Sequence, residues 1–321
     1  MDNAGFGDNP AVDVTAVIIL CVIIILSTTC NTTAIYHIRN SSKKSLKEKI
    51  VLLLCTINLF QALGGYSIEL HAAFTGGIKS IECQIQGFIV CLCTYSNIGL
   101  FVSLTIHKYL IIIYPFQSDR WLKGRFIPAS FLIVPLITGF ILGTPPLLGW
   151  GKYWKPRNES FYCSYVFENM TDRAFFLSAV VCGFAIPAVL ASICLKRIVK
   201  ELRRATYKYR RRYGKSSSIS ADSSKRVQEQ ELHSVLTGVV YFLSWSPYCT
   251  ITLLLFFQQH VPKELEYFSI CMCKSSTVSS ALLFCLIEKR ARQYIKEKVS
   301  LVESAVMSPS IGTDTTKPVS G

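Results

Sequence analysis

Seven long runs of apolar residues constrain the fold of this chain more than any other feature of its sequence. Each run reaches about 20 residues, the length that an α-helix needs to cross the ~30 Å hydrocarbon core of a bilayer. Backbone groups in lipid must form their hydrogen bonds within the segment, so the runs are expected to be helical. The runs lie near residues 13–37, 49–74, 84–114, 126–148, 174–196, 232–257 and 266–287. The sequence therefore predicts an all-α membrane protein with a seven-transmembrane helix bundle.

The charged residues lie in the connections between the runs and indicate how the bundle is oriented. Half of the 321 residues are hydrophobic and 17% are charged, with a formal net charge of +14. Basic residues cluster in alternate connections, at 39–49, 108–125, 196–226 and 289–298. The positive-inside rule makes these connections cytoplasmic, with the N terminus extracellular and the C terminus cytoplasmic. We expect a multi-pass plasma membrane protein that binds no nucleic acid, because its basic residues do not share one soluble domain.

Three parts of the chain are expected from this pattern. Residues 1–12 form an extracellular tail, residues 13–298 the membrane domain, and residues 299–321 a disordered cytoplasmic tail. The serines and threonines of the cytoplasmic tail are candidates for phosphorylation. The basic inner segment around 203–212 fits either anionic lipid headgroups or a cytosolic protein, and composition does not separate the two.

The outer connection before the fifth run carries candidate covalent modifications. Asn158 and Asn169 begin glycosylation sequons, and Asn158 is favoured because Asn169 lies close to the fifth run. Most of the 13 cysteines lie inside the runs and are interpreted as small apolar residues. Cys83 and Cys163 lie on the predicted outer side, where a disulfide can persist. We expect these two cysteines to form a bridge.

One lysine lies well inside the last apolar run. Lys274 follows a largely apolar stretch, and the run continues for more than ten residues beyond it. A charge within a membrane span costs about 2.5–3.5 kcal/mol on insertion scales, so each one is a candidate functional site. The alternative is a lysine that snorkels to the surface, which requires its ammonium to rise roughly 12 Å. In an apolar site a neutral lysine amine can condense with an aldehyde to form a Schiff base.

A protonated Schiff base at Lys274 would need an anion, and Glu69 is the best candidate. Glu69 lies late in the second run, about six residues or ~9 Å from its outer end. Lys274 lies at a similar depth from the outer end of its own run, so the two side chains can pair across the bundle. Two alternatives remain: Glu69 stays solvated or protonated near the interface, or Glu159 supplies the anion if the outer connection folds inward.

The order and spacing of these and other residues resemble the animal opsins, rhodopsin-like receptors that bind retinal through a lysine in the seventh helix. The matching positions are Asn31, Leu59-Phe60, Gly64-Gly65, Cys83, Tyr109, Pro145-Pro-Leu-Leu-Gly-Trp150, Cys163, Pro187, Trp245-Ser-Pro247-Tyr248 and Lys274-Ser-Ser276. The resemblance covers about residues 25–298 and is closest to divergent non-visual types, near the neuropsin or retinal G-protein-coupled receptor and peropsin groups.

The resemblance implies a set of roles for named residues. Retinal, as the 11-cis or all-trans isomer, forms a Schiff base on Lys274, and Trp245 and Tyr248 pack against its polyene. The Cys83–Cys163 bridge lies beneath an outer loop that covers the pocket. Pro187 and Pro247 introduce hinges or bulges, and a short amphipathic eighth helix lies on the cytoplasmic side.

The sequence departs from the opsin pattern in ways that bear on function. The glutamate counterion of vertebrate visual pigments is replaced by the neutral Gln86. The family's other counterion glutamate, in the outer loop, has no clean equivalent because Arg157 occupies its place, and this raises the weight on Glu69. The triplet of an acidic residue, arginine and tyrosine that would face a G protein becomes His107, Lys108 and Tyr109, and lysine lacks the planar fork of arginine. The membrane aspartate of the second span becomes Asn58. The ligand pocket is therefore better preserved than the signalling motifs.

Three functions fit these observations. The leading hypothesis is a light-sensing receptor, not an enzyme, which activates a heterotrimeric G protein through its inner connections and engages receptor kinase and arrestin through its Ser/Thr-rich tail. The second is a retinal photoisomerase or retinoid-binding protein with little G-protein signalling. The third is a receptor for another small ligand, with Lys274 binding an anion.

Overall fold

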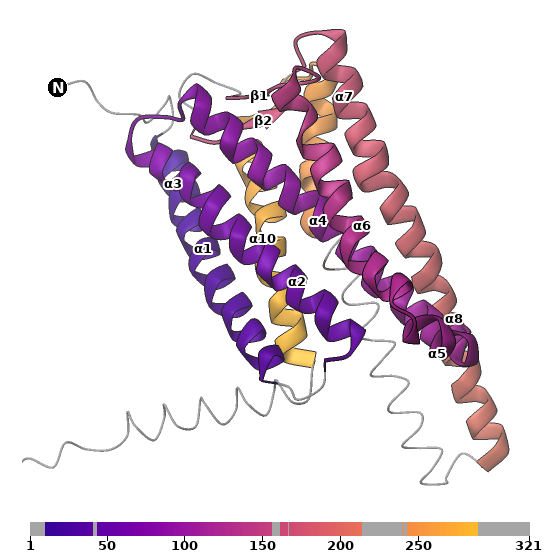
Figure 1. Ribbon diagram of the computed structural model, residues 1–321. Helices are drawn as coiled ribbons and strands as arrows, with labels where there is room; N and C mark the ends of the chain where they lie inside the picture. The colour runs from indigo at the N-terminus through magenta and orange to yellow at the C-terminus, as the bar shows by residue number, and fades with distance from the viewer. Residues whose placement is uncertain are drawn as a thin grey trace, which may run out of the picture.

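Apolar helices account for most of the chain (Figure 1). The computed structural model describes residues 10–40, 44–155, 161–165, 167–213, 240 and 243–287. Within them, five helical segments are long and apolar enough to cross a membrane: Val14–Arg39, Leu46–Phe74, Ser80–Ile113, Phe126–Leu148 and Met170–Lys208. A shorter apolar helix, Leu243–Phe256, and helix α10 (Lys263–Ile287) follow them along the chain. The predicted seven-helix bundle is confirmed.

Two of these spans are each interrupted by one π-helical turn. The helices that precede the fifth span are α1 (Pro10–Arg39), α2 (Leu46–Phe60), α3 (Ser67–Phe74), α4 (Ser80–Ile113), α5 (Pro115–Lys123) and α6 (Phe126–Gly143). The fifth span comprises α7 (Met170–Val180) and α8 (Ile186–Tyr213). A π-turn at Gln61–Tyr66 joins α2 to α3, and another at Val181–Ala185 joins α7 to α8 directly before Pro187. The bulge expected near Pro187 is present, because proline cannot donate the regular helical hydrogen bond.

A short hairpin covers one end of the bundle. After α6 a 3-10 turn at Pro145–Leu148 leads to β1 (Tyr153–Trp154), which pairs antiparallel with β2 (Ser164–Tyr165). Figure 1 shows both strands at the end of the bundle opposite α5. We call the end of the bundle that carries the strands the hairpin end, which is predicted to be extracellular. The opposite end is the α5 end, which is predicted to be cytoplasmic.

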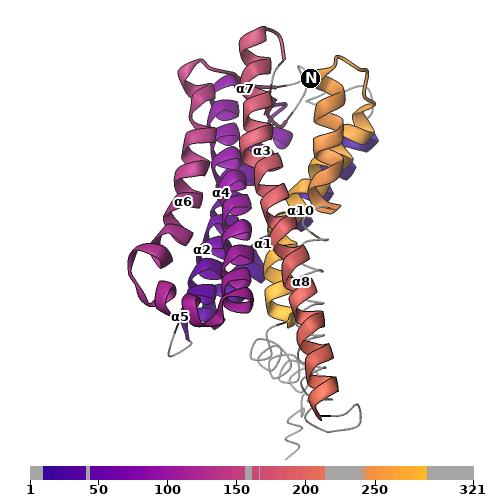
Figure 2. The same ribbon diagram turned by 90° about the vertical axis from the view of Figure 1, so that its right-hand side faces the viewer.

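Helix α4 lies at the centre of the bundle and packs against α2, α6 and α8, while α1 packs against α10. Figure 2 shows α4 between α6 and the other helices. Glycines allow the closest approach: a Cβ atom at Gly139 of α6 would lie 2.1 Å from Ser96 Oγ and 2.5 Å from the Leu92 carbonyl oxygen of α4. Small residues drive such contacts between membrane helices, because they let the two backbones come together.

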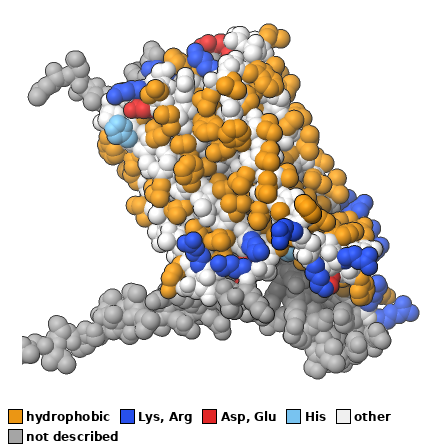
Figure 3. All heavy atoms as spheres, viewed as in Figure 1, with side chains coloured by type: hydrophobic (Ala, Val, Ile, Leu, Met, Phe, Trp, Pro, Cys, Tyr) orange, Lys and Arg blue, Asp and Glu red, His pale blue; other side chains and the backbone are white. Residues whose placement is uncertain are grey.

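The surface matches a membrane-embedded bundle. Figure 3 shows hydrophobic side chains along the flank of the molecule and lysine and arginine side chains gathered near the α5 end. Large apolar residues such as Ile25, Ile141 and Phe140 are exposed, as expected for residues that contact lipid rather than water.

Several expectations lie outside the described residues. They are Asn158 and Glu159 in the outer connection, the beginning of the sixth run, most of the inner segment after Tyr213, the eighth helix and the tail 299–321. Asn169 is described and exposed, and its side chain caps α7 by accepting a hydrogen bond of 2.8 Å from the backbone N–H of Asp172.

Candidate ligand-binding site

The π-turn between α2 and α3 determines where Glu69 points. One extra residue in a helical turn rotates the following helix by roughly 100° relative to the preceding one. The turn contains Gly64 and Gly65, and a Cβ atom at Gly65 would lie only 2.8 Å from Val90 Cγ2 of α4. Glycine thus permits α4 to approach the turn closely. Glu69, in the first turn of α3, is buried with 1% of its surface exposed.

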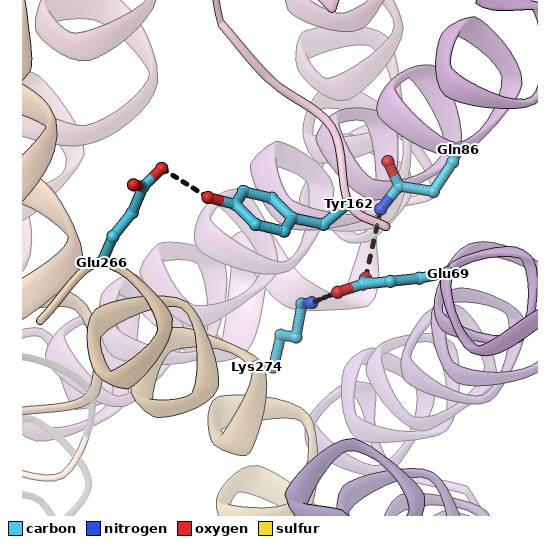
Figure 4. Close-up of polar contacts among 5 residues, drawn as sticks. All are labelled: Glu69, Gln86, Tyr162, Glu266 and Lys274. Atoms are coloured by element: carbon cyan, nitrogen blue, oxygen red, sulfur yellow. Dashed lines mark hydrogen bonds and ion pairs between the residues drawn. The ribbon is translucent and has the colours of Figure 1, made fainter. Parts of the chain in front are cut away.

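Glu69 and Lys274 form a buried ion pair. Lys274, on α10, is 6% exposed, and its ammonium donates a hydrogen bond to Glu69 Oε1. The Lys274 ammonium also lies 5.4 Å from the centroid of the Tyr66 ring, within the range of a cation–π contact. Figure 4 shows the Lys274 and Gln86 side chains both directed at the Glu69 carboxylate. The lysine therefore reaches across the bundle instead of snorkelling to the surface.

Gln86 supplies the second contact to the carboxylate. Its Nε2 donates to Glu69 Oε2 over 3.4 Å, and this contact fixes the amide orientation because a carboxylate only accepts. The other amide atom, Gln86 Oε1, is buried and has no hydrogen-bond partner among the described residues. An unpaired buried acceptor is unfavourable, so this position suits a ligand or water that can donate a hydrogen bond.

Lys274 lies in the wall of a cavity between α4, the π-turns, α10 and the hairpin. The cavity has a volume of about 110 Å³. Its lining is mostly apolar and aromatic and includes Val90, Ile98, Phe176, Val180, Phe184, Trp245, Tyr248, Cys249, Ile270 and Cys273. Trp245 and Tyr248 pack edge to face, with ring centroids 6.2 Å apart. The structure thus brings both predicted pocket aromatics into the cavity that contains Lys274.

A cluster of hydroxyl and thiol groups lines another part of the cavity. The Tyr165 hydroxyl lies 3.0 Å from Cys91 Sγ and 3.1 Å from the Tyr95 hydroxyl, within hydrogen-bonding distance of both. Tyr165 belongs to β2, and burial raises its pKa well above the ordinary value of a phenol. The Tyr165 hydroxyl is therefore neutral and available as a hydrogen-bond donor in this wall.

The hairpin end of the cavity is covered by the segment that follows the outer connection. The predicted Cys83–Cys163 disulfide is present and ties this segment to the start of α4. Tyr162, next to Cys163, lines the cavity, and its hydroxyl donates a hydrogen bond to Glu266 Oε1 on α10 (Figure 4). The segment is thus attached to α4 on one side and to α10 on the other.

The residues expected to face a cytoplasmic partner have different surroundings. His107 is 7% exposed and packs edge to face against Phe131 of α6, so its ring does not contribute to the exposed α5 end. Tyr109 is half-buried, and its hydroxyl accepts a hydrogen bond of 3.1 Å from Arg197 Nη1 of α8. Lys108 is also half-buried.

Sequence reasoning missed a network of amide side chains inside the bundle. Asn58 Nδ2 donates to Asn31 Oδ1 and to Ser280 Oγ, and Asn97 Nδ2 donates to Asn58 Oδ1 over 2.8 Å and to Gln61 Oε1 over 3.4 Å. The network joins α1, α2, the π-turn at Gln61–Tyr66, α4 and α10, and Gln61 also lines the cavity. A signal was available, because Gln61 and Asn97 are carboxamides within otherwise apolar runs, where polar groups need partners.

Comparison with known proteins identifies the class. The family model described as 7 transmembrane receptor (rhodopsin family) matches residues 31–282. Among solved structures, squid rhodopsin superposes with a TM-score of 0.75, covering 96% of this chain and 93% of the squid protein at 18% sequence identity. At that identity the superposition supports the fold alone.

Curated relatives narrow the class. The chain is 24% identical over 287 residues to a protein named "Rhodopsin, GQ-coupled" from Mizuhopecten yessoensis, and 23% identical over 240 residues to Melanopsin-B from Xenopus laevis. These matches cover 84% and 72% of this chain but only 56% and 44% of the relatives, about half of their length. Rhodopsin from Galeus melastomus is 24% identical over 266 residues. The chain belongs to the rhodopsin family of seven-transmembrane receptors, and within it is of the animal opsin type.

The residues of the cavity fit a retinal group. A primary amine lines a mostly apolar cavity, and its charged form has a carboxylate partner in Glu69. Trp245 and Tyr248 offer flat apolar surfaces for a conjugated chain. The free acceptor on Gln86 lies beside the carboxylate that the amine contacts, where an N–H group of a bound ligand could donate.

Proposed function

We propose that this protein is a light-sensing receptor that binds retinal as a Schiff base on Lys274, with Glu69 as the counterion. The observation that carries the proposal is the buried Lys274–Glu69 pair in the wall of an aromatic cavity. Charged side chains in a membrane bundle are costly and occur where they serve a function. Retinal supplies the absorption of visible light and the change of shape that follows it.

Each side chain around the amine has a distinct task in this proposal. Glu69 compensates the positive charge, and Gln86 orients the carboxylate by donating to Oε2. Tyr66 presents its ring to the same cation. Trp245 and Tyr248 form a wall that a change in ligand shape would push against, and this displaces the Leu243–Phe256 helix that carries them.

Reconstitution in membranes tests the proposal. With 11-cis or all-trans retinal added, the wild-type protein is expected to give a pigment band in the visible range that Lys274→Ala lacks. Lys274→Arg is a matched control, because it keeps the charge opposite Glu69 but has no amine that condenses with an aldehyde. A band of equal strength in wild type and Lys274→Ala would refute Schiff-base attachment at this residue. No band in either protein would favour a receptor for another small ligand.

Signalling through a heterotrimeric G protein at the α5 end is the second part of the proposal. The family supports it, whereas Lys108 in place of arginine and the neutral amide network around Asn58 favour a second candidate, a retinal photoisomerase. Light-driven GTP exchange in membranes that contain the pigment would support the receptor. Release of isomerised retinal without such exchange would support the isomerase.

A further inference from the structure

The segment that covers the cavity is held at two points of different chemistry. The Cys83–Cys163 disulfide attaches it covalently to α4. On the opposite side, Tyr162 attaches it to α10 through a hydrogen bond to Glu266. A hydrogen bond can open and close without chemical change, whereas the disulfide cannot. The α10 side is therefore where this cover can separate from the bundle.

Both partners of this hydrogen bond are withdrawn from solvent. Tyr162 is 4% exposed and Glu266 is 5% exposed. The Tyr162 ring packs against Phe161 and Tyr267, with ring centroids 6.0 Å and 5.5 Å away, and Phe161 stacks on Tyr267 at 5.4 Å. A buried carboxylate is stable only where hydrogen-bond donors contact it. The hydrogen bond from the Tyr162 hydroxyl to Glu266 therefore stabilises the Tyr162 side chain in this position.

The contact lies directly over the Lys274 site. Glu266 and Lys274 are on the same helix, eight residues or about 12 Å apart. Tyr162 and Ile270 line the cavity between the Glu266 carboxylate and the amine, whereas Glu266 does not line it. Figure 4 shows the Tyr162 side chain directed at the Glu266 carboxylate, above the Lys274–Glu69 pair in this view.

We propose that Glu266 is a positioning residue that holds Tyr162 closed over the cavity, so that the Tyr162–Glu266 contact controls the access of water and small polar molecules to Lys274. Glu266 acts through Tyr162 and does not touch the ligand. The inference concerns the retinal site of the proposed function and rests on it only for the identity of the ligand. The closure itself is a property of the protein without ligand.

Cys273 provides a reporter of this access. Its thiol lines the cavity beside Lys274, so a charged, water-soluble methanethiosulfonate reagent reaches it only when the mouth is open. The rate of Cys273 modification in ligand-free protein, read by mass spectrometry of its peptide, measures that opening. The variants are Tyr162→Phe, which removes only the donor, Glu266→Leu, which removes the acceptor, and the double variant. Glu168→Gln, an exposed carboxylate at the same end, is the control.

Each single variant is expected to raise the modification rate by roughly 10- to 100-fold, the range that loss of one hydrogen bond to a charged group implies. Tyr162 and Glu266 also have other interactions, so the double variant decides whether they act through each other. A double variant no faster than the faster single variant supports the proposal. Glu266→Gln keeps an acceptor oxygen and is expected to lie closer to wild type than Glu266→Leu.

Two results would overturn the proposal: a wild-type rate in either single variant, or a double variant whose effect is the product of the two single effects. A parallel measurement separates this inference from the proposed function. In retinal-loaded membranes the same variants should lose their visible band to hydroxylamine in the dark faster than wild type. If no pigment forms at all, the proposed function fails while the Cys273 rates still test the closure.

Discussion

The Glu69→Gln substitution gives the sharpest test of the ion pair. Glutamine has nearly the same shape as glutamate, so it removes the charge opposite Lys274 and leaves the packing around Tyr66 and Gln86 in place. Two unit charges ~4 Å apart attract by about 4 kcal/mol at an effective dielectric constant of about 20. Since 1.36 kcal/mol corresponds to one pH unit, the charge loss is worth about 3 units.

The expected result follows from the sign of this interaction. Glu69 stabilises the protonated, visible-absorbing form of the pigment, so its removal moves the midpoint between visible and near-ultraviolet absorption down by about 3 pH units. The assay is an absorbance titration of retinal-loaded membranes, with Glu69→Asp to retain the charge and Glu168→Gln as an exposed carboxylate control. A Glu69→Gln midpoint equal to that of wild type would refute the counterion role and direct attention to Glu159.

Three further predictions concern the same region and the packing that supports it. Gln86→Leu removes the contact that orients the Glu69 carboxylate toward the Lys274 nitrogen, so the midpoint in the same titration should fall by about 1 unit, less than in Glu69→Gln. An equal or larger fall would contradict this orienting role of Gln86. Cys83→Ser opens a covalent link between positions 80 residues apart, which is expected to cost about 4.5 kcal/mol and to lower the Tm in detergent by several degrees or more; an unchanged Tm would show that the link does not support the fold. Gly139→Val places side-chain atoms where a Cβ would already lie 2.1 Å from Ser96 Oγ, so thermal unfolding should show a loss of about 1–3 kcal/mol. Gly124→Val should change it little, because a Cβ there would lie 3.5 Å from the Trp121 carbonyl oxygen, an ordinary van der Waals distance.

The ion pair and the disulfide could be predicted because their residue types are unusual for their positions in the chain. Lys274 and Glu69 are charged residues within apolar runs, so their positions along the spans were enough to suggest a pair at matched depth. The cysteines of the disulfide stood out because both lie on the oxidising side. In each case a general property of membrane chains, the cost of buried charge or the oxidising outer side, identified the residue without knowledge of the neighbouring helices.

Other parts of the site could not be predicted in this way. The direction of Glu69 depends on the π-turn at Gln61–Tyr66, and hydrophobic periodicity assumes a regular helix, so it cannot detect one extra residue in a turn. The Tyr162–Glu266 contact joins residues 104 positions apart, one in a loop and one in the first turn of a helix, where neither tyrosine nor glutamate is unusual. His107 was expected at the exposed end, but its orientation is set by packing against Phe131.

The contact between Tyr109 and Arg197 makes the two candidate functions physically distinct. It joins α4 to α8 at the α5 end, far from the cavity, over 3.1 Å. A receptor that moves its fifth span outward to admit a G protein must break this hydrogen bond, because its two partners lie on the helices that separate. A photoisomerase needs only the cavity and its cover to change, and the contact can persist through the whole cycle. The two functions therefore share the Lys274 site, but only the receptor requires this single hydrogen bond at the other end of the bundle to break.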